Sequence, residues 1–156
     1  QRQMCIRDRE NPAQLNTKET NNENSKYESD LIRTQYRNLI LDNIEYALLA
    51  ARNPTDRARL DELVRLMLDT ICARRKTIRI AQNDFPTEVV KSQFLKLNAE
   101  HIQYVLDRMR QNTTEIRNIK QYLLAALYNA PLTMENYYAA QINHDLYGRN
   151  RGDAIC

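Results

Sequence analysis

Glycine is almost absent from this chain of 156 residues: it occurs at positions 148 and 152, both near the C-terminus. Loops that hold a phosphate with backbone N–H groups need glycine where the backbone approaches the ligand closely. No such position exists in the body of the chain. The sequence therefore excludes a Rossmann or P-loop nucleotide site, and it predicts no cofactor.

Cysteine and long apolar runs are also scarce. The three cysteines, Cys5, Cys72 and Cys156, lack the spacing of a metal site. Such usage indicates a reducing compartment without a disulfide framework. The longest apolar run, near YLLAALYNA, is far shorter than a membrane span, and no signal peptide is visible. We therefore expect a cytoplasmic protein that does not associate with a membrane.

Residue patterns that support catalysis are missing as well. The two histidines, His101 and His144, fall on different predicted helices, and no HExxH or Gly-x-Ser-x-Gly motif occurs. His144 and Asp145 do not form an acid–base pair by spacing alone, because adjacent residues on a helix point in different directions. His101 has no second ligand at metal spacing, which favours packing or capping. The sequence predicts neither an enzyme nor a metal site.

Polarity divides the chain into regions. Residues 10–29 are rich in Asn, Gln, Glu, Lys and Thr, and they cannot bury enough apolar area to offset the entropy of ordering, which predicts a disordered linker. Helical periodicity begins near Asp30 and continues to Gly148. We therefore expect an all-α domain over residues 30–148, a compact bundle of about six helices, followed by a tail over residues 149–156.

The helix boundaries follow from capping residues and prolines. The first helix covers residues 30–51, and Asn53-Pro54 supplies the N-cap and first residue of the second. Thr77 to Ile80 alternates polar and apolar residues, which favours a short extended connector. The remaining helices begin at Pro86, Asn98, Asn112 and Thr133, with Pro131 ending the fifth and Gly148 the sixth.

Apolar spacing predicts which side chains face the core. The first helix has the stripe Ile32, Tyr36, Ile40, Ile44, Ala47 and Ala51. The second has Leu60, Leu63, Val64, Met67, Ile71 and Cys72, and the third has Val89, Val90, Phe94 and Leu95. The later helices contribute Ile102, Val105, Leu106, Met109, Leu123, Leu127, Met134, Tyr137 and Ile142, among others.

Charge is segregated along the chain. The segment from Ile71 to Lys96 contains six cationic and two acidic residues. The segment from Arg108 to Lys120 contains four cationic residues and one acidic residue. A basic face of this kind can bind phosphate or an acidic protein, although cations near a helix C-terminus also complement the helix dipole. The candidate binding residues are Arg74, Arg75, Lys76, Arg79, Lys91, Lys96, Arg117 and Lys120.

Tyrosine is abundant in the last two predicted helices. Tyr122, Tyr128, Tyr137 and Tyr138 lie there. These rings could stack on nucleic-acid bases. Amphipathic packing in the core is the favoured interpretation.

Three long stretches resemble one family. They are RLDELVRLMLDTICARRKTIRIAQNDFPTEVVKSQFLKLNAEHIQYVLDRM, NTTEIRNIKQYLLAALYNAP and NYYAAQINHDLYG. They are similar to the uncharacterised C-terminal domain of replication initiator A proteins of plasmids and integrative elements in Firmicutes, over roughly residues 39–148. Gln82-Asn83 departs from the Gly-Asp expected there, which puts any role of that loop in question.

The resemblance implies a fold and a role. Such domains resemble the DnaD-type helical fold of primosomal proteins and are thought to connect the initiator to host replication proteins such as primase. Initiators of this family carry a winged-helix domain that binds origin repeats, and residues 1–29 cannot hold one. The resemblance therefore implies a C-terminal fragment of a longer initiator.

The ends of the chain carry their own interpretations. The opening QRQMCIRDR resembles translated sequencing-adapter read-through, so residues 1–9 are interpreted as an artefact. The Arg-Gly-Asp triplet in the tail matches an adhesion motif that occurs often by chance.

Two functions remain open. The first is a non-catalytic interaction domain that recruits a host replication protein through its basic residues. The second is a helical module that binds the DNA phosphate backbone near the origin.

Overall fold

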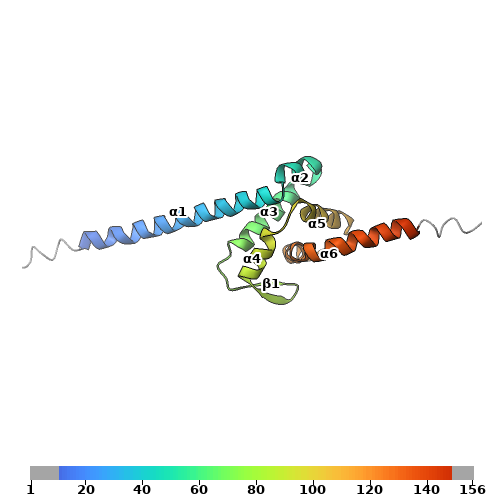
Figure 1. Ribbon diagram of the computed structural model, residues 1–156. Helices are drawn as coiled ribbons and strands as arrows, with labels where there is room; N and C mark the ends of the chain where they lie inside the picture. Colours follow the sequence, from blue (N-terminus) through green and yellow to red (C-terminus); the bar gives the residue numbers. More distant parts are fainter. Residues whose placement is uncertain (1–10, 149–156) are drawn as a thin grey trace, which may run out of the picture. The chain divides into compact units, whose positions relative to one another are not determined.

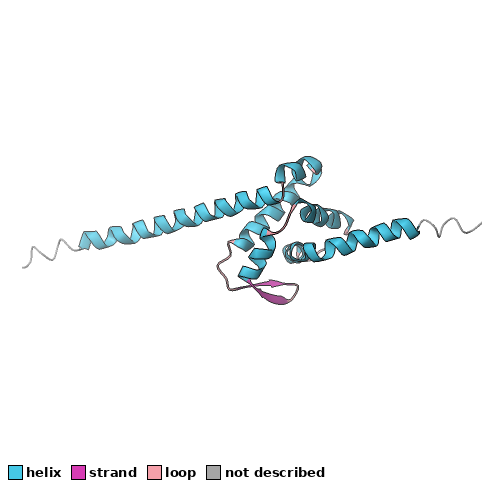
Figure 2. Ribbon diagram, viewed as in Figure 1, coloured by secondary structure: helices cyan, strands magenta, loops and turns pink. Residues whose placement is uncertain are grey.

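The structure, a computed structural model, describes residues 11–148. The interpretations of residues 1–9 and 149–156 lie outside the described residues. The chain divides into two units, Gln1–Tyr36 and Arg37–Cys156, which we take separately. The described residues form six α-helices, one short 3₁₀ helix and one two-stranded sheet (Figure 2). The prediction of a mostly helical fold of six helices is confirmed.

The first helix is longer than the sequence predicts. Helix α1 spans Asn11–Asn43, whereas the prediction places a disordered linker over residues 10–29 and starts the helix near Asp30. Residues 13–29 contain no proline or glycine and include several good helix formers, so a polar helix can continue through them. Most side chains from residue 21 to residue 35 are exposed, as the low apolar content requires.

The predicted helix over residues 30–51 is in fact two helices. Helix α1 ends at Asn43 and α2 spans Tyr46–Arg52, with Glu45 between them at φ 51° and ψ 51°, in the left-handed region. The side chain of Asn43 donates to the carbonyl of Leu95 at 2.9 Å, which fixes this corner. Ile40 and Ile44 are buried as predicted, but the change in helix direction leaves Ala47 and Ala51 exposed.

Helix α3 lies at the centre of the second unit. A 3₁₀ helix, η2, spans Pro54–Asp56 and leads into α3 at Arg57–Ile71. Pro54 occupies the first helical position as predicted, but the Asn53 side chain makes no capping hydrogen bond. The predicted stripe is buried except for Cys72, which is half-buried, and Leu66, Leu68 and Thr70 are buried as well. A helix with this much buried surface packs against neighbours on more than one side.

A β-hairpin follows α3. Strands β1 (Thr77–Ile80) and β2 (Asn83–Pro86) pair antiparallel, with Ile80 opposite Asn83. The predicted extended segment is therefore confirmed as β1, and Ile78 and Ile80 are buried by the alternation expected. The sequence missed β2, because the two turn residues, Ala81 and Gln82, carry no hairpin signal. They have φ values of 48° and 70°, the left-handed conformation of a two-residue turn.

Substitution of Gln82 by glycine is expected to raise the free energy of unfolding by about 1 kcal/mol. A side chain at positive φ costs about 1–2 kcal/mol, part of which glycine loses again through the entropy of the unfolded chain. Urea denaturation followed by circular dichroism measures the change. Gln82→Ala keeps a side chain at the same φ, so it should bring no gain. An equal increase in the free energy of unfolding for Gln82→Gly and Gln82→Ala would contradict backbone strain at Gln82.

Helices α4 and α5 follow the hairpin in the chain. Helix α4 spans Thr87–Leu95 and α5 spans Ala99–Gln111, and the hairpin lies next to α4 (Figure 1). Val90 and Phe94 are buried as predicted. Val89 is 47% exposed, so its predicted inward position is wrong. Helix α4 places its core side chains four residues apart, which turns Val89 toward solvent.

Asn98 caps α5 as the sequence predicts. Its side chain accepts from the backbone N–H of His101 at 3.0 Å, and Nδ1 of His101 accepts from the backbone N–H of Asn98 at 3.2 Å. The two interactions form a capping box with histidine at its third position. His101 is therefore a capping residue, one of the two roles that its sequence position favours.

This cap makes stability depend on pH. Burial lowers the pKa of His101 below 6.5, and the charge of Glu100 opposes this only in part. Well above pH 6.5 the His101 ring is neutral in both the folded and the unfolded chain, so the full stabilising effect of the cap is present. As the pH falls through 6.5 toward the lower folded pKa, the unfolded chain binds more protons and stability is lost. We expect a loss below about 1 kcal/mol, because solvent screens the half-exposed ring.

Urea titrations at several pH values compare the wild type with His101→Gln. Glutamine also suits this capping position but does not titrate. The difference in unfolding free energy between the two proteins should change as the pH falls below 6.5. A constant difference would contradict the lowered pKa of His101.

Helix α6 replaces the last two predicted helices. It spans Ile119–Gly148 and contains Pro131, where the prediction ends one helix and begins another. Asn112 does not begin a helix: its side chain accepts from the backbone N–H of Thr114 at 3.0 Å. Asn118 takes the capping role instead, accepting from Gln121 N–H at 3.2 Å. Leu123, Leu127 and Ala130 are buried, and this first part of α6 packs on the other elements of the second unit.

Candidate anion-binding site

The eight predicted cations lie on several elements. Arg74, Arg75 and Lys76 lie in the connection from α3 to β1, and Arg79 lies on β1. Lys91 is in α4 and Lys96 directly follows it, while Arg117 precedes α6 and Lys120 lies in its first turn. All are exposed except Lys91, which is half-buried.

The structure brings three of these cations together around one pocket. Arg75, Arg79 and Lys120 come from two separate basic stretches of the sequence, and all three line a cavity of about 150 Å³ between α3, β1 and α6. The remaining lining residues are Leu66, Asp69, Thr70, Ala73, Ile78, Gln121 and Leu124. The cavity therefore has an apolar wall from the core and three positive charges.

Local hydrogen bonds hold the loop that carries Arg75. The buried side chain of Thr87 donates to the carbonyl of Arg75 at 2.5 Å, and the backbone N–H of Thr87 donates to the carbonyl of Lys76 at 3.0 Å. Both donors belong to the first residue of α4. The backbone at Arg75 is thus fixed by tertiary contact, although its side chain is exposed.

The other two cations are placed by buried neighbours. Arg79 lies between Ile78 and Ile80, whose burial attaches β1 to the core. Lys120 lies in the first turn of α6, which Leu123 and Leu124 attach to the core. Three separately anchored elements therefore present the three charges.

The pocket carries an excess of positive charge. Its lining includes three cations and one carboxylate, Asp69. The ion pairs described for Arg59, Lys91 and Arg110 involve Asp56, Glu88 and Asp107, none of which lines this pocket. Lys120 and Gln121 belong to the first turn of α6, where the helix dipole adds a partial positive charge. An anion would reduce the repulsion between these groups.

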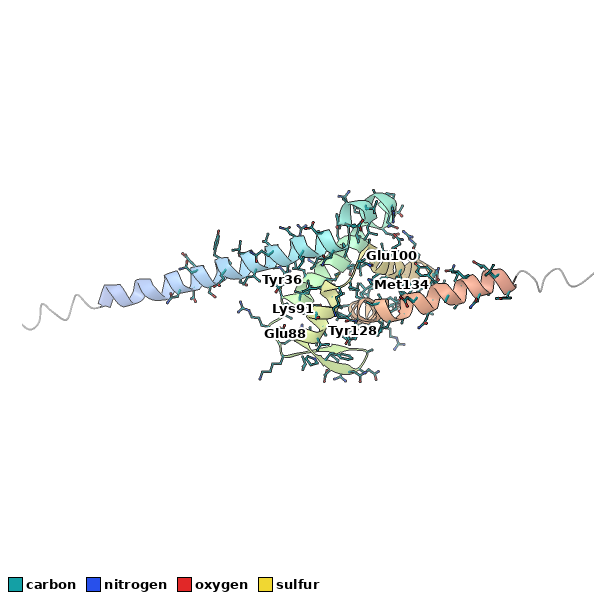
Figure 3. The ribbon with its side chains drawn as sticks, in the orientation of Figure 1. Tyr36, Glu88, Lys91, Glu100, Tyr128 and Met134 are labelled. Carbon is teal, nitrogen blue, oxygen red and sulfur yellow. The ribbon has the colours of Figure 1, made fainter. Side chains whose placement is uncertain are left out.

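The other five candidates do not line this pocket. Lys91 lies 4.0 Å from Glu88, one turn earlier on α4, and Figure 3 labels both side chains. Arg74, Lys76, Lys96 and Arg117 are exposed. Three of the eight candidates therefore line this cavity.

A buried polar network occupies a different part of the second unit. Arg110 donates to Asp56 and Asn53, each at 2.6 Å, and to Asp107 at 2.8 Å. Asn53 also exchanges hydrogen bonds with Gln103, at 2.7 and 3.3 Å. Asp56 and Asn53 are buried, so these bonds satisfy polar groups that join η2 to α5. The Asn53 side chain is used here, which is why it does not cap the helix that follows.

Tyr128 and Tyr137 pack against other side chains as the favoured interpretation predicts, whereas Tyr138 is partly exposed. The ring of Tyr128 lies 4.8 Å from that of Phe85 on β2. Tyr137 and Tyr138 both make edge contacts with Tyr104, and Arg108 lies 5.1 Å above the ring of Tyr137. Burial raises the pKa of Tyr138, with a smaller effect from Asp107. Stacking of these rings on nucleic-acid bases stays a prediction.

A second cavity lies between α5 and α6. It has a volume of about 200 Å³, and its lining includes Tyr104, Tyr122 and Arg108. Beyond it, α6 exposes large apolar side chains from Leu132 onward. They are Leu132 at 65%, Tyr138 at 38%, Ile142 at 58%, Leu146 at 62% and Tyr147 at 71%. Ile142 was predicted to face the core, and this prediction is wrong, because its side chain is mostly exposed.

The described residues show neither a metal-ligand cluster nor a membrane span. No group of three or more His, Cys, Asp or Glu side chains among them could hold a metal ion. No helix among them combines the length and the apolar character needed to cross a membrane. His144 lies with Nδ1 3.6 Å from Asp145, and both side chains are largely exposed.

The elements and the cavity together define a mostly helical domain with a small hairpin and a cationic pocket. The model of a family of unknown function, DUF6017, matches residues 7–149, and the chain belongs to this family. Comparison with curated proteins and with solved structures found no match.

Proposed function

We propose that this chain is the non-catalytic interaction domain of a plasmid or mobile-element replication initiator. In this role it recruits host replication proteins, with primase as the first partner, to the origin in the cytoplasm. The resemblance of its three sequence stretches to initiator C-terminal domains supports the proposal. The exposed apolar side chains of α6 are the observation that carries it.

These side chains form a row rather than isolated positions. Tyr138, Ile142 and Leu146 are spaced four residues apart, so they follow one another along one side of α6. Contiguous exposed apolar surface marks interaction sites in soluble proteins, whereas single exposed apolar residues do not. A protein partner would remove this row from water.

Co-elution of the full chain with purified host primase tests recruitment. The variant Ile142→Asp with Leu146→Asp should abolish a complex that the wild type forms. The matched control, Asn136→Asp with Ala140→Asp, adds the same charges on another side of the same helix and should leave the complex intact. Absence of a wild-type complex, or equal loss in both variants, would contradict recruitment through this row.

A second function is supported by the cationic pocket. Arg75, Arg79 and Lys120 line one cavity, and this excess of positive charge favours binding to the DNA phosphate backbone near the origin. Fluorescence anisotropy with labelled single- and double-stranded DNA at several salt concentrations tests this function. Binding should weaken steeply with salt. No binding at low salt would remove DNA as a ligand.

A further inference from the structure

We infer that the cavity between α3, β1 and α6 encloses a single phosphate group, which Arg75, Arg79 and Lys120 bind together. This inference rests on the second proposed function for the source of the phosphate. It goes beyond that function by assigning one shared anion to three cations. A basic surface without a cavity would instead place each cation on a different phosphate.

The size of the cavity accommodates a phosphate. Its volume is about 150 Å³, well above the roughly 10–15 Å³ that one ordered water molecule requires. The cavity is open to solvent on one side, so the rest of a ligand, such as a nucleic-acid strand, can extend outside it.

The lining groups match the chemistry of a phosphate. Arg75 and Arg79 each offer a planar fork of N–H donors that suits two phosphate oxygens, and Lys120 adds a compact positive charge. The nearby N-terminus of α6 favours an anion through its dipole. Gln121 contributes a neutral side-chain amide to the lining, whereas the hydroxyl of Thr70 already donates to the carbonyl of Leu66 at 2.7 Å.

A shared phosphate predicts a small change in salt dependence. For single-stranded DNA the slope of log K against log salt is about −0.7 for each phosphate contacted. The triple variant Arg75→Ala, Arg79→Ala, Lys120→Ala should therefore reduce the slope by about 0.7, the value for one phosphate. The single variants should be non-additive, since each weakens the same contact.

The experiment measures anisotropy of a labelled single-stranded oligonucleotide with the full chain and these four variants. The control variant Arg74→Ala, Lys76→Ala, Arg117→Ala removes three neighbouring charges that do not line the cavity. All six positions are exposed, so circular dichroism should show that the variants stay folded. A slope reduced by about 2 in the pocket triple variant, with additive single effects, would show three separate phosphates and overturn the inference.

Binding of inorganic phosphate and of pyrophosphate tests the phosphate site independently of the proposed DNA-binding function. Calorimetry should show saturable binding of one anion by the wild type and the control variant, and none by the pocket triple variant. If this holds while DNA does not bind, the phosphate site stands, a free or small-molecule phosphate is its source, and the DNA-binding function fails. If the anions bind the pocket triple variant as well as the wild type, or bind neither, the site is wrong.

Discussion

Replacement of Phe94 by alanine is expected to lower the free energy of unfolding by about 3–5 kcal/mol. Phe94 on α4 is 1% exposed and is among the largest fully buried side chains of the second unit. Truncation removes the apolar area of the ring and leaves a cavity that the neighbours fill only partly. Because domains are stable by only about 5–15 kcal/mol, a large fraction of the variant should unfold at modest denaturant concentrations.

Urea denaturation followed by far-ultraviolet circular dichroism measures this loss. Val89→Ala on the same helix is the matched control, because Val89 is 47% exposed and should cost less than about 1 kcal/mol. The sequence places both residues in the core, so the two variants also separate the sequence prediction from the structure. Equal losses at Val89 and Phe94 would contradict the burial that the structure assigns.

Replacement of Pro131 by alanine should raise the stability of α6 by up to about 3 kcal/mol. Proline inside a helix lacks the N–H that would donate to the carbonyl of Leu127, four residues earlier, and its ring clashes with that carbonyl. The structure continues α6 through this position. Alanine restores the hydrogen bond and has the highest helix propensity, so both helicity and the unfolding free energy should increase.

Circular dichroism and urea denaturation of Pro131→Ala measure both quantities. Pro54→Ala is the matched control, because Pro54 lies at the first position of η2, where no N–H is needed. That variant should be neutral or slightly destabilised, since it also loosens the unfolded chain. A Pro131→Ala variant without any gain would favour two helices that end and begin at Pro131, as the sequence predicts.

Local signals allowed much of the fold to be predicted. Asn98 caps α5 through its own neighbour His101, and Ile78 and Ile80 alternate with polar residues along β1. The stripe of α3 from Leu60 to Ile71 is buried because its spacing matches one face of a helix. Each of these features depends on residues within a few positions of one another, so the sequence contains the information.

The errors occur where distant contacts override a local signal. Glu45 adopts a left-handed conformation that no local pattern marks, while the side chain of nearby Asn43 bonds to Leu95. Strand β2 exists because it pairs with β1, although its turn has neither glycine nor asparagine. Pro131 lies within a helix whose preceding turns are attached to the core by Leu123 and Leu127.

By itself, the sequence determined a mostly helical chain without glycine loops, a set of eight candidate cations and the residue types of a core. Only the tertiary structure decided that Arg75, Arg79 and Lys120 share a cavity and that Arg110 joins a buried network. The physical reason is that exposed charged residues follow no periodic pattern in the sequence, so the pattern does not indicate which of them lie together in the folded protein. Which cations meet depends on the packing of α3, β1 and α6, and that packing is set by apolar contacts far apart in the chain.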